Sequence, residues 1–271
     1  QKNKERVNEA KIKASKIVSL CKGGPFALNL IRAHVHSSAL YGTKINGMSD
    51  KTLDDVRAMT RSSTSTRAAG RSSRIDLLLQ AQRDIDRAFA ANCAPLLEWA
   101  KRVNNAFYHK DEKAVIRMRG AWSAAMANML HHNASEDKVW NSVRGPASAC
   151  IATLGRIGWD VHITSAWRVW LDRAGNEIDL AATSIHSLKQ VLWRDIAIAL
   201  WTQSTLNEEI GDNLGLWLEP IRAAVLQKDR WLGAMSRFAA IGNQWTQDRV
   251  AQAGYANSKD DTLCRSCEQA T

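Results

Sequence analysis

The residues best suited to chemistry in this 271-residue chain are five arginines in a stretch that holds no acidic residue. Eight serines and threonines lie among them. A guanidinium binds phosphate through two parallel hydrogen bonds, and hydroxyl and backbone N–H groups add donors, so this stretch predicts phosphate binding. The alternative is a loop whose charges are only solvated. The candidate nucleic-acid-binding residues are Arg57, Arg61, Arg67, Arg71 and Arg74.

A Cys-x-x-Cys pair, Cys264 and Cys267, has the spacing of two ligands of a tetrahedral zinc site. Four protein ligands normally close a structural zinc site, and no histidine or cysteine follows Cys267. We therefore expect weak zinc binding here and tight binding in a longer parent polypeptide that supplies the missing ligands. The sequence starts at Gln1 and stops at Thr271, and we expect it to be part of such a polypeptide. The alternatives for the two thiols are apolar packing or a redox pair.

Tryptophan is unusually frequent, with 11 residues against seven phenylalanines and tyrosines together. These rings could stack on nucleobases. Helical spacing, however, places Trp99 and Trp122 on apolar faces, and Trp159 and Trp167 fall on the apolar side of a predicted hairpin, so core packing is favoured. Trp170 alternates with its neighbours and is predicted to face the other way, as the best candidate for an exposed ring.

No catalytic set is visible in the sequence. The Gly-x-Gly-x-x-Gly, P-loop and Gly-x-Ser-x-Gly motifs are absent. His34 and His36 lie two positions apart on a predicted helix, which turns their rings about 200° apart and away from a shared metal. No aspartate pair lies on a strand pattern, as a two-metal polymerase would need. Whether the chain is an enzyme stays open.

The hydrophobic periodicity predicts a mainly α, multi-helical protein with one small β-hairpin at about residues 159–180. Ser49-Asp50, Asp111 and Thr183 or Ser184 are expected to cap helices, and Pro95 is expected at the first position of another helix. The turn of the hairpin is predicted at residues 172–176, where aspartate, glycine and asparagine occur together.

The composition is that of a globular protein with a basic surface: 37 lysines and arginines against 27 acidic residues give a net charge of +10. A positive surface favours an anionic partner such as RNA or DNA. No stretch reaches the roughly 18 apolar residues of a membrane span, so no membrane partner is expected. Five cysteines without a disulfide spacing indicate a reducing compartment, and we expect an intracellular protein, nuclear or cytoplasmic.

Several short landmarks follow one another in a distinctive order. They are Leu40–Gly42, Gly47–Asp50, Val56-Arg57, Val143–Pro146, Ile157–Trp159, the Leu171–Leu180 hairpin and Asn243–Thr246 before the Cys-x-x-Cys pair. This order resembles the region downstream of the polymerase domain in non-LTR (LINE-type) retrotransposon reverse transcriptases. The polymerase palm signature, an aromatic residue followed by Ala-Asp-Asp, is absent, so this segment alone would not polymerise.

The resemblance implies a parent RNA-directed DNA polymerase in which this segment is a nucleic-acid-binding accessory. It would hold template RNA or an RNA–DNA hybrid beside the parent's palm, with zinc bound in the full-length parent. The implied organisation is a thumb-like segment (1–59), an Arg/Ser-rich loop (60–74), a helical connector (75–145), helices plus the hairpin (146–253) and a tail with half of a zinc knuckle (254–271).

Two other functions compete with this hypothesis. One is a helical protein–protein interaction scaffold in which the basic Arg/Ser loop is a regulatory segment. The other, the least favoured, is an enzyme whose site is dispersed along the sequence. Salt-dependent binding of RNA or DNA separates the first hypothesis from the scaffold, because phosphate contacts release counterions.

Overall fold

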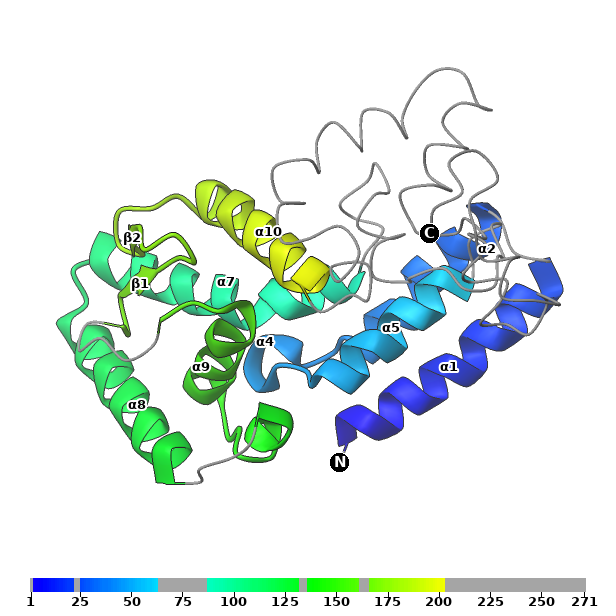
Figure 1. Cartoon of the computed structure of the whole chain (residues 1–271), viewed down its shortest axis with the longest axis horizontal. Coiled ribbons are helices and arrows are strands. Elements are labelled where there is room, and N and C mark those ends of the chain that lie inside the picture. Colours follow the sequence, from blue (N-terminus) through cyan, green and yellow to red (C-terminus); the bar gives the residue numbers. More distant parts are fainter. Residues whose placement is uncertain (1, 22–24, 63–86, 132–135, 161–165, 203–271) are drawn as a thin grey trace, which may run out of the picture.

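The computed structural model describes residues 2–21, 25–62, 87–131, 136–160 and 166–202 and shows a mainly helical protein (Figure 1). The strands in these ranges form a two-stranded antiparallel sheet. The expected multi-helical fold with one small hairpin is therefore confirmed. The buried apolar side chains form two clusters, one among the N-terminal helices and one among the helices around the hairpin.

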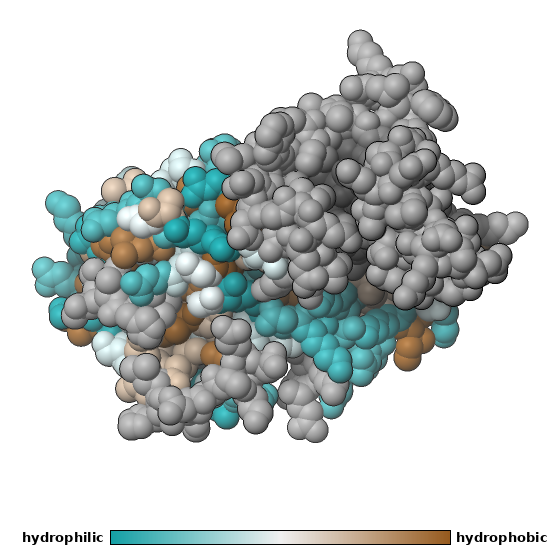
Figure 2. All heavy atoms as spheres, viewed as in Figure 1, coloured by the Kyte–Doolittle hydropathy of each residue, from teal (hydrophilic) through white to brown (hydrophobic). Residues whose placement is uncertain are grey.

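The first cluster forms because apolar residues recur at helical spacing. Val7, Ala10, Ala14 and Val18 are buried along one face of α1, while lysine and glutamate residues occupy its exposed face. In Figure 2 the exposed surface of this region is largely hydrophilic. The helices of this group are α1 (Lys2–Cys21), α2 (Pro25–Leu30), η1 (Ile31–Val35), α3 (His36–Ala39) and α5 (Asp50–Ser62).

Helix α5 continues three residues into the segment that was predicted to be a loop from residue 60. The reason is burial, since Met59 and Thr60 are 4% and 0% exposed. The Thr60 hydroxyl also donates to the Val56 carbonyl over 3.0 Å. The loop boundary at residue 60 is therefore wrong, and the helix ends at Ser62.

Helix α7 (Arg87–Tyr108) joins the two clusters, because Ala88 and Ala91 belong to the first and Leu96 and Val103 to the second. Pro95 lies inside this helix and not at its first position, so that prediction is wrong. A proline inside a helix costs about 3 kcal/mol through a lost hydrogen bond and a steric clash. Burial on both sides of Pro95 offsets this cost, because ending the helix there would expose apolar side chains of both clusters.

The second cluster is enclosed by helices, and the predicted caps of two of them, at Asp111 and Ser184, are confirmed. The Asp111 carboxylate accepts the Ala114 N–H over 2.9 Å, and Ser184 Oγ accepts the Ser187 N–H over 3.0 Å. Gly158, with a φ of 74°, ends α9 in the left-handed conformation. The elements are α8 (Glu112–His131), η2 (Glu136–Asn141), α9 (Pro146–Ile157), β1 (Val169–Leu171), β2 (Glu177–Asp179) and α10 (Ile185–Thr202).

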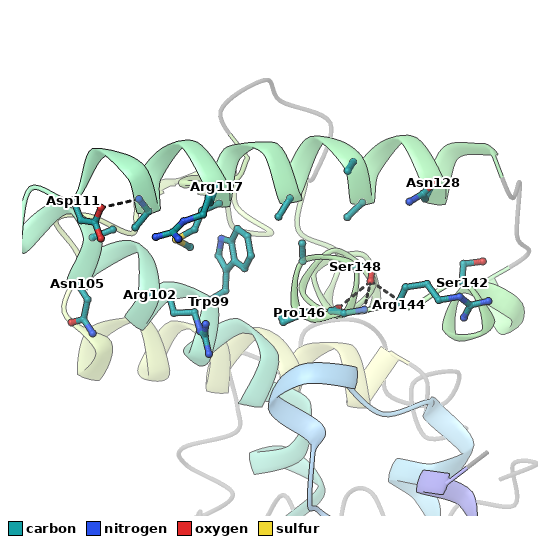
Figure 3. Close-up of a pocket in the computed structure, with 18 of the residues that line it drawn as sticks. Trp99, Arg102, Asn105, Asp111, Arg117, Asn128, Ser142, Arg144, Pro146 and Ser148 are labelled. Atoms are coloured by element: carbon teal, nitrogen blue, oxygen red, sulfur yellow. Dashed lines mark hydrogen bonds between the residues drawn. The ribbon is translucent and has the colours of Figure 1, made fainter.

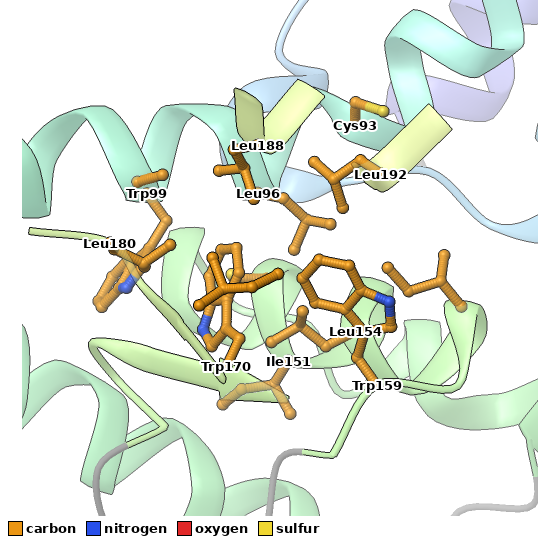
Figure 4. Packing of buried hydrophobic residues seen from close by; sticks show 14 of the residues in the cluster. Cys93, Leu96, Trp99, Ile151, Leu154, Trp159, Trp170, Leu180, Leu188 and Leu192 are labelled. Atoms are coloured by element: carbon orange, nitrogen blue, oxygen red, sulfur yellow. The ribbon is translucent and has the colours of Figure 1, made fainter. Parts of the chain in front are cut away.

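The hairpin packs on this cluster through Trp170, which pairs with Ile178 across the two strands. Trp170 is 0% exposed and lies among the buried side chains of the cluster (Figure 4). Its indole N–H donates to the Ala166 carbonyl over 2.8 Å. The prediction of an exposed ring was therefore wrong. Strands of three residues give too short an alternation to show which face is inward, and it is the pairing with Ile178 that decides it.

Arg156 of α9 fastens the second cluster to the first. Its guanidinium lies 2.8 Å from the Asp50 carboxylate, donates to the Asn92 side-chain oxygen over 2.8 Å and donates to the Met48 carbonyl. It also lies 4.1 Å from the ring centre of Trp140. The partners come from α5, α7, η2 and the loop that follows the short helix α4 (Thr43–Asn46).

We expect the substitution Arg156→Met to lower the free energy of unfolding by about 2–4 kcal/mol, since it leaves buried oxygen atoms without their charged donor. Chemical denaturation measures this loss. Arg102→Met is the control, because Arg102 is 59% exposed and pairs with Glu98 at the surface, where such pairs contribute less than about 1 kcal/mol. Equal losses for the two variants would contradict the role of Arg156.

His36 is a buried titratable group in the first cluster, 1% exposed. Its Nε2 lies 3.1 Å from the Thr60 hydroxyl. That hydroxyl donates to the Val56 carbonyl, so the ring donates from Nε2 and its Nδ1 has no hydrogen-bond partner. Burial, together with the nearby charges of Arg87 and Arg32, lowers the pKa of His36 from 6.5 to about 4.

The folded chain therefore binds fewer protons than the unfolded chain between about pH 6.5 and pH 4. We expect the free energy of unfolding to fall across this window as the pH is lowered, by up to about 3 kcal/mol. Denaturation curves at several pH values measure the fall, and His36→Gln should remove most of it. The control His34→Gln alters an exposed ring and should leave the curve unchanged; a curve unaffected by His36→Gln would refute the assignment.

Candidate functional site

A groove of about 670 Å³ lies between α7, α8 and the beginning of α9 (Figure 3). We call it the α7–α9 groove. Each of these elements supplies one arginine to its lining: Arg102 from α7, Arg117 from α8 and Arg144 from the loop before α9. The volume lies in the range of about 300–1,000 Å³ that is typical of sites for small organic ligands or parts of larger ones.

The three arginines are exposed. Arg102 contacts Glu98 over 3.2 Å, and one nitrogen of Arg144 donates to the Asn141 carbonyl over 2.7 Å. Figure 3 shows Arg102 and Arg117 on one side of Pro146 and Arg144 on the other. The groove therefore carries positive charge at two separate places, which matches a ligand with more than one anionic group.

The floor of the groove is apolar and made mostly of small side chains. Trp99 and Met118 belong to it together with six alanines. Trp99 is held in place because its indole N–H donates to the Trp167 carbonyl over 2.8 Å and its ring packs on Trp122. The alanines are Ala106, Ala114, Ala121, Ala124, Ala125 and Ala147.

The start of α9 forms one wall of the groove through Pro146, Ala147 and Ser148. Ser148 Oγ accepts the N–H groups of Arg144 and Gly145 over 2.9 and 3.1 Å. This bonding fixes the loop that carries Arg144. The positive end of the α9 dipole also faces the groove and adds to the charge of the arginines.

The turn between α7 and α8 closes one end of the groove. His109 lines it, and the Tyr108 ring meets the His109 ring edge to face at 5.0 Å. Tyr108 is 80% exposed, so its ring faces solvent at this end of the groove. Asp111 is also at this end, and its carboxylate is used as the cap of α8.

The structure describes two of the five arginines that the sequence singled out. Arg57 is 3% exposed and donates to the Asp54 carboxylate over 3.2 Å, and Arg61 is half-buried near the end of α5. Neither lines the α7–α9 groove. Arg67, Arg71 and Arg74 lie outside the described residues, as do Cys264 and Cys267, so the phosphate-binding and zinc predictions for them stay predictions.

Sequence reasoning missed the α7–α9 groove. Its arginines are separated by 15 and 27 positions and belong to three elements, so no local motif joins them. The signal that could have indicated it is the small-residue stripe of α8, where Ala114, Ala121 and Ala125 recur at helical spacing beside Arg117. A stripe of this kind indicates a hollow or a close helix contact, and the sequence does not distinguish the two.

A second group of charged side chains lies at the hairpin turn, and it has a structural role. Asp195, 0% exposed, accepts the Trp159 indole N–H over 2.7 Å and Arg194 Nε over 2.8 Å. Asp172 accepts N–H groups of Ala174 and Asn176, each over 2.9 Å, and is 3.0 Å from Arg194 Nη2. Burial raises the pKa of Asp172, but these hydrogen bonds outweigh burial and hold the pKa below its ordinary value. Both carboxylates therefore serve as acceptors that fix the turn against α10.

Among the residues that the structure describes, no group of three or more histidines, cysteines and acidic residues could hold a metal ion. Cys150 is fully buried, and burial raises the pKa of its thiol. None of the described helices combines the length and the apolar character that a membrane crossing requires.

Comparisons with known proteins identify no related protein. No family model matches the chain, and no curated protein and no solved structure matches it.

Proposed function

We propose that this chain binds nucleic acid and that the α7–α9 groove is the binding site in its described part. The observation that carries the proposal is the convergence of three exposed arginines, from three separate elements, on one hollow. A net charge of +10 supports it, because a basic surface attracts the phosphate backbone over a distance.

The spacing of the charges favours a polyanion over a single anion. Arg102 and Arg117 lie on one side of Pro146 and Arg144 on the other, so a bound chain can place separate phosphates at the two positions (Figure 3). A carboxylate or a single phosphate would use only one of them. Arginine also suits this task, because its planar guanidinium binds phosphate through paired hydrogen bonds.

In the wider proposal, the segment serves as an accessory to an RNA-directed DNA polymerase and holds template RNA or an RNA–DNA hybrid. Its support is the order of sequence landmarks that resembles non-LTR retrotransposon proteins. The basic stretch from Arg61 to Arg74 would add a second set of phosphate contacts. The partners would be RNA or DNA and the palm of the parent polypeptide.

The second candidate is a helical scaffold for protein partners. One observation favours it: α1 and α2 carry large apolar side chains at the surface, with Ile12, Leu20 and Phe26 exposed by 59%, 84% and 67%. Exposed apolar residues of this size are common at protein interfaces. A chain that binds no nucleic acid would favour this function.

The test compares two triple variants of the full chain that remove the same charge. Arg102→Ala, Arg117→Ala and Arg144→Ala empty the groove of its arginines, whereas Lys101→Ala, Lys113→Ala and Arg119→Ala remove exposed charges on α7 and α8 outside the groove. Fluorescence anisotropy with a labelled 20-nucleotide RNA, at several salt concentrations, gives affinities and salt slopes.

We expect the groove variant to weaken binding and to flatten the plot of log affinity against log salt by about 2 units, one phosphate contact for each arginine. The control variant should keep a slope close to that of the unmodified chain. Equal effects of the two variants would show that binding follows net charge alone and would overturn the groove as the site. Absence of binding by the unmodified chain would remove the proposed function.

A further inference from the structure

The arginines of the α7–α9 groove select for anionic groups, and the floor of the groove selects in addition for an apolar group on the ligand. Six alanines, Met118 and Trp99 form an apolar surface in the groove, which the arginines also line. A phosphate backbone that contacted only the arginines would leave this apolar surface exposed to water. Its burial would then add nothing to the free energy of binding. A ligand that fills the groove must therefore bring an apolar, flat group between its anionic groups.

The concave shape of the site distinguishes paired from unpaired nucleic acid. Proteins reach the bases of a duplex by inserting a convex element, such as a helix or a ribbon, into one of its grooves. The α7–α9 groove instead receives atoms of the ligand, and in a duplex the faces of the bases are covered by their neighbours. An unpaired base has a free face and free edges, so it can enter the groove while its own phosphates stay at the rim.

The polar side chains around the floor suit the edges of such a base. Asn105, Asn128 and Ser142 line the groove, and Asn128 and Ser142 lie on the Arg144 side of Pro146 in Figure 3. Amide and hydroxyl groups both donate and accept hydrogen bonds, as the edges of nucleobases do. With the edges of the base at these polar groups, the face of the base can pack on the apolar floor.

The exposed Tyr108 ring offers a stacking surface for a neighbouring base. Its partner His109 lines the groove, and the two rings are 5.0 Å apart, so Tyr108 lies next to the end of the groove. A base that stacks on an aromatic side chain contributes to binding regardless of its identity. This position extends the site beyond the hollow itself.

We infer that the α7–α9 groove binds single-stranded RNA or DNA by taking one unpaired base onto its alanine floor, with flanking phosphates on Arg102, Arg117 and Arg144. The inference rests on the proposed function and gives it a substrate class. A site of this kind differs from one that holds a duplex or an RNA–DNA hybrid, because such a site would contact only the sugar-phosphate backbone.

The test measures binding of three labelled probes by the full chain at one salt concentration: a 15-nucleotide single-stranded RNA, a single-stranded DNA of the same sequence, and the duplex of that DNA with its complement. The groove is filled without a change of charge by Ala121→Leu with Ala124→Leu. The control Ala127→Leu adds the same side chain to an exposed position of α8 that does not line the groove.

The unmodified chain should bind the single strands at least about tenfold more tightly than the duplex, which corresponds to base stacking of about 1.4 kcal/mol. The filled groove should remove this preference, leave duplex binding unchanged and behave like the control in thermal unfolding. Tyr108→Ala should weaken single-strand binding by about tenfold. Weaker binding of RNA than of DNA would assign the groove to DNA, and the reverse would assign it to RNA; both results support an unpaired base.

Two results would overturn the inference. One is duplex binding as tight as single-strand binding by the unmodified chain, which needs no variant and so does not depend on how the filled groove folds. The other is a folded variant with a filled groove that keeps the preference for single strands. In the first case the chain would still bind nucleic acid, so the proposed function would stand. In the second case the chain would still bind nucleic acid, but at a site other than the α7–α9 groove. Binding of none of the three probes would instead remove the proposed function and leave the groove to a protein partner.

Discussion

The arrangement of the two clusters depends on one buried cation, Arg156. Burial lowers the pKa of this guanidinium to about 10, although Asp50 opposes the shift, so it stays charged at neutral pH. A charge in this position must be met by acceptors, and the loop after α4, α5 and α7 supply them. The same side chain packs on the Trp140 ring of η2, and α9 packs against α7.

The packing of α9 against α7 and α8 places the first residues of α9 at one wall of the α7–α9 groove. Arg144 and the first residues of α9 face α8 across the hollow because α9 is held at its other end by Arg156 and by the packing of Leu154 and Ile157. The alanines of α8 then leave a space where larger side chains would have closed it. Stability and site thus share one cause, namely that α9 is fixed on both sides.

Much of the fold follows from the sequence, and the failures have physical reasons. The caps at Asp111 and Ser184 are local signals, and they predicted the correct helix starts. Pro95 and Trp170 misled the interpretation because tertiary packing overrides the local preference of proline and because a short strand does not define its inward face. The groove could not be derived from the sequence, since its arginines surround one hollow only when α7, α8 and the loop before α9 are placed in space.

The most direct test of the central claim is photo-crosslinking of the full chain to a single-stranded RNA that carries 4-thiouridine, followed by peptide mapping. If the RNA enters the α7–α9 groove, crosslinks should form in the peptides that contain Tyr108 and His109 and in the part of α8 from Arg117 to Asn128, which line or adjoin the groove. Crosslinks confined to other parts of the chain would contradict it, because the RNA would then bind without entering the α7–α9 groove.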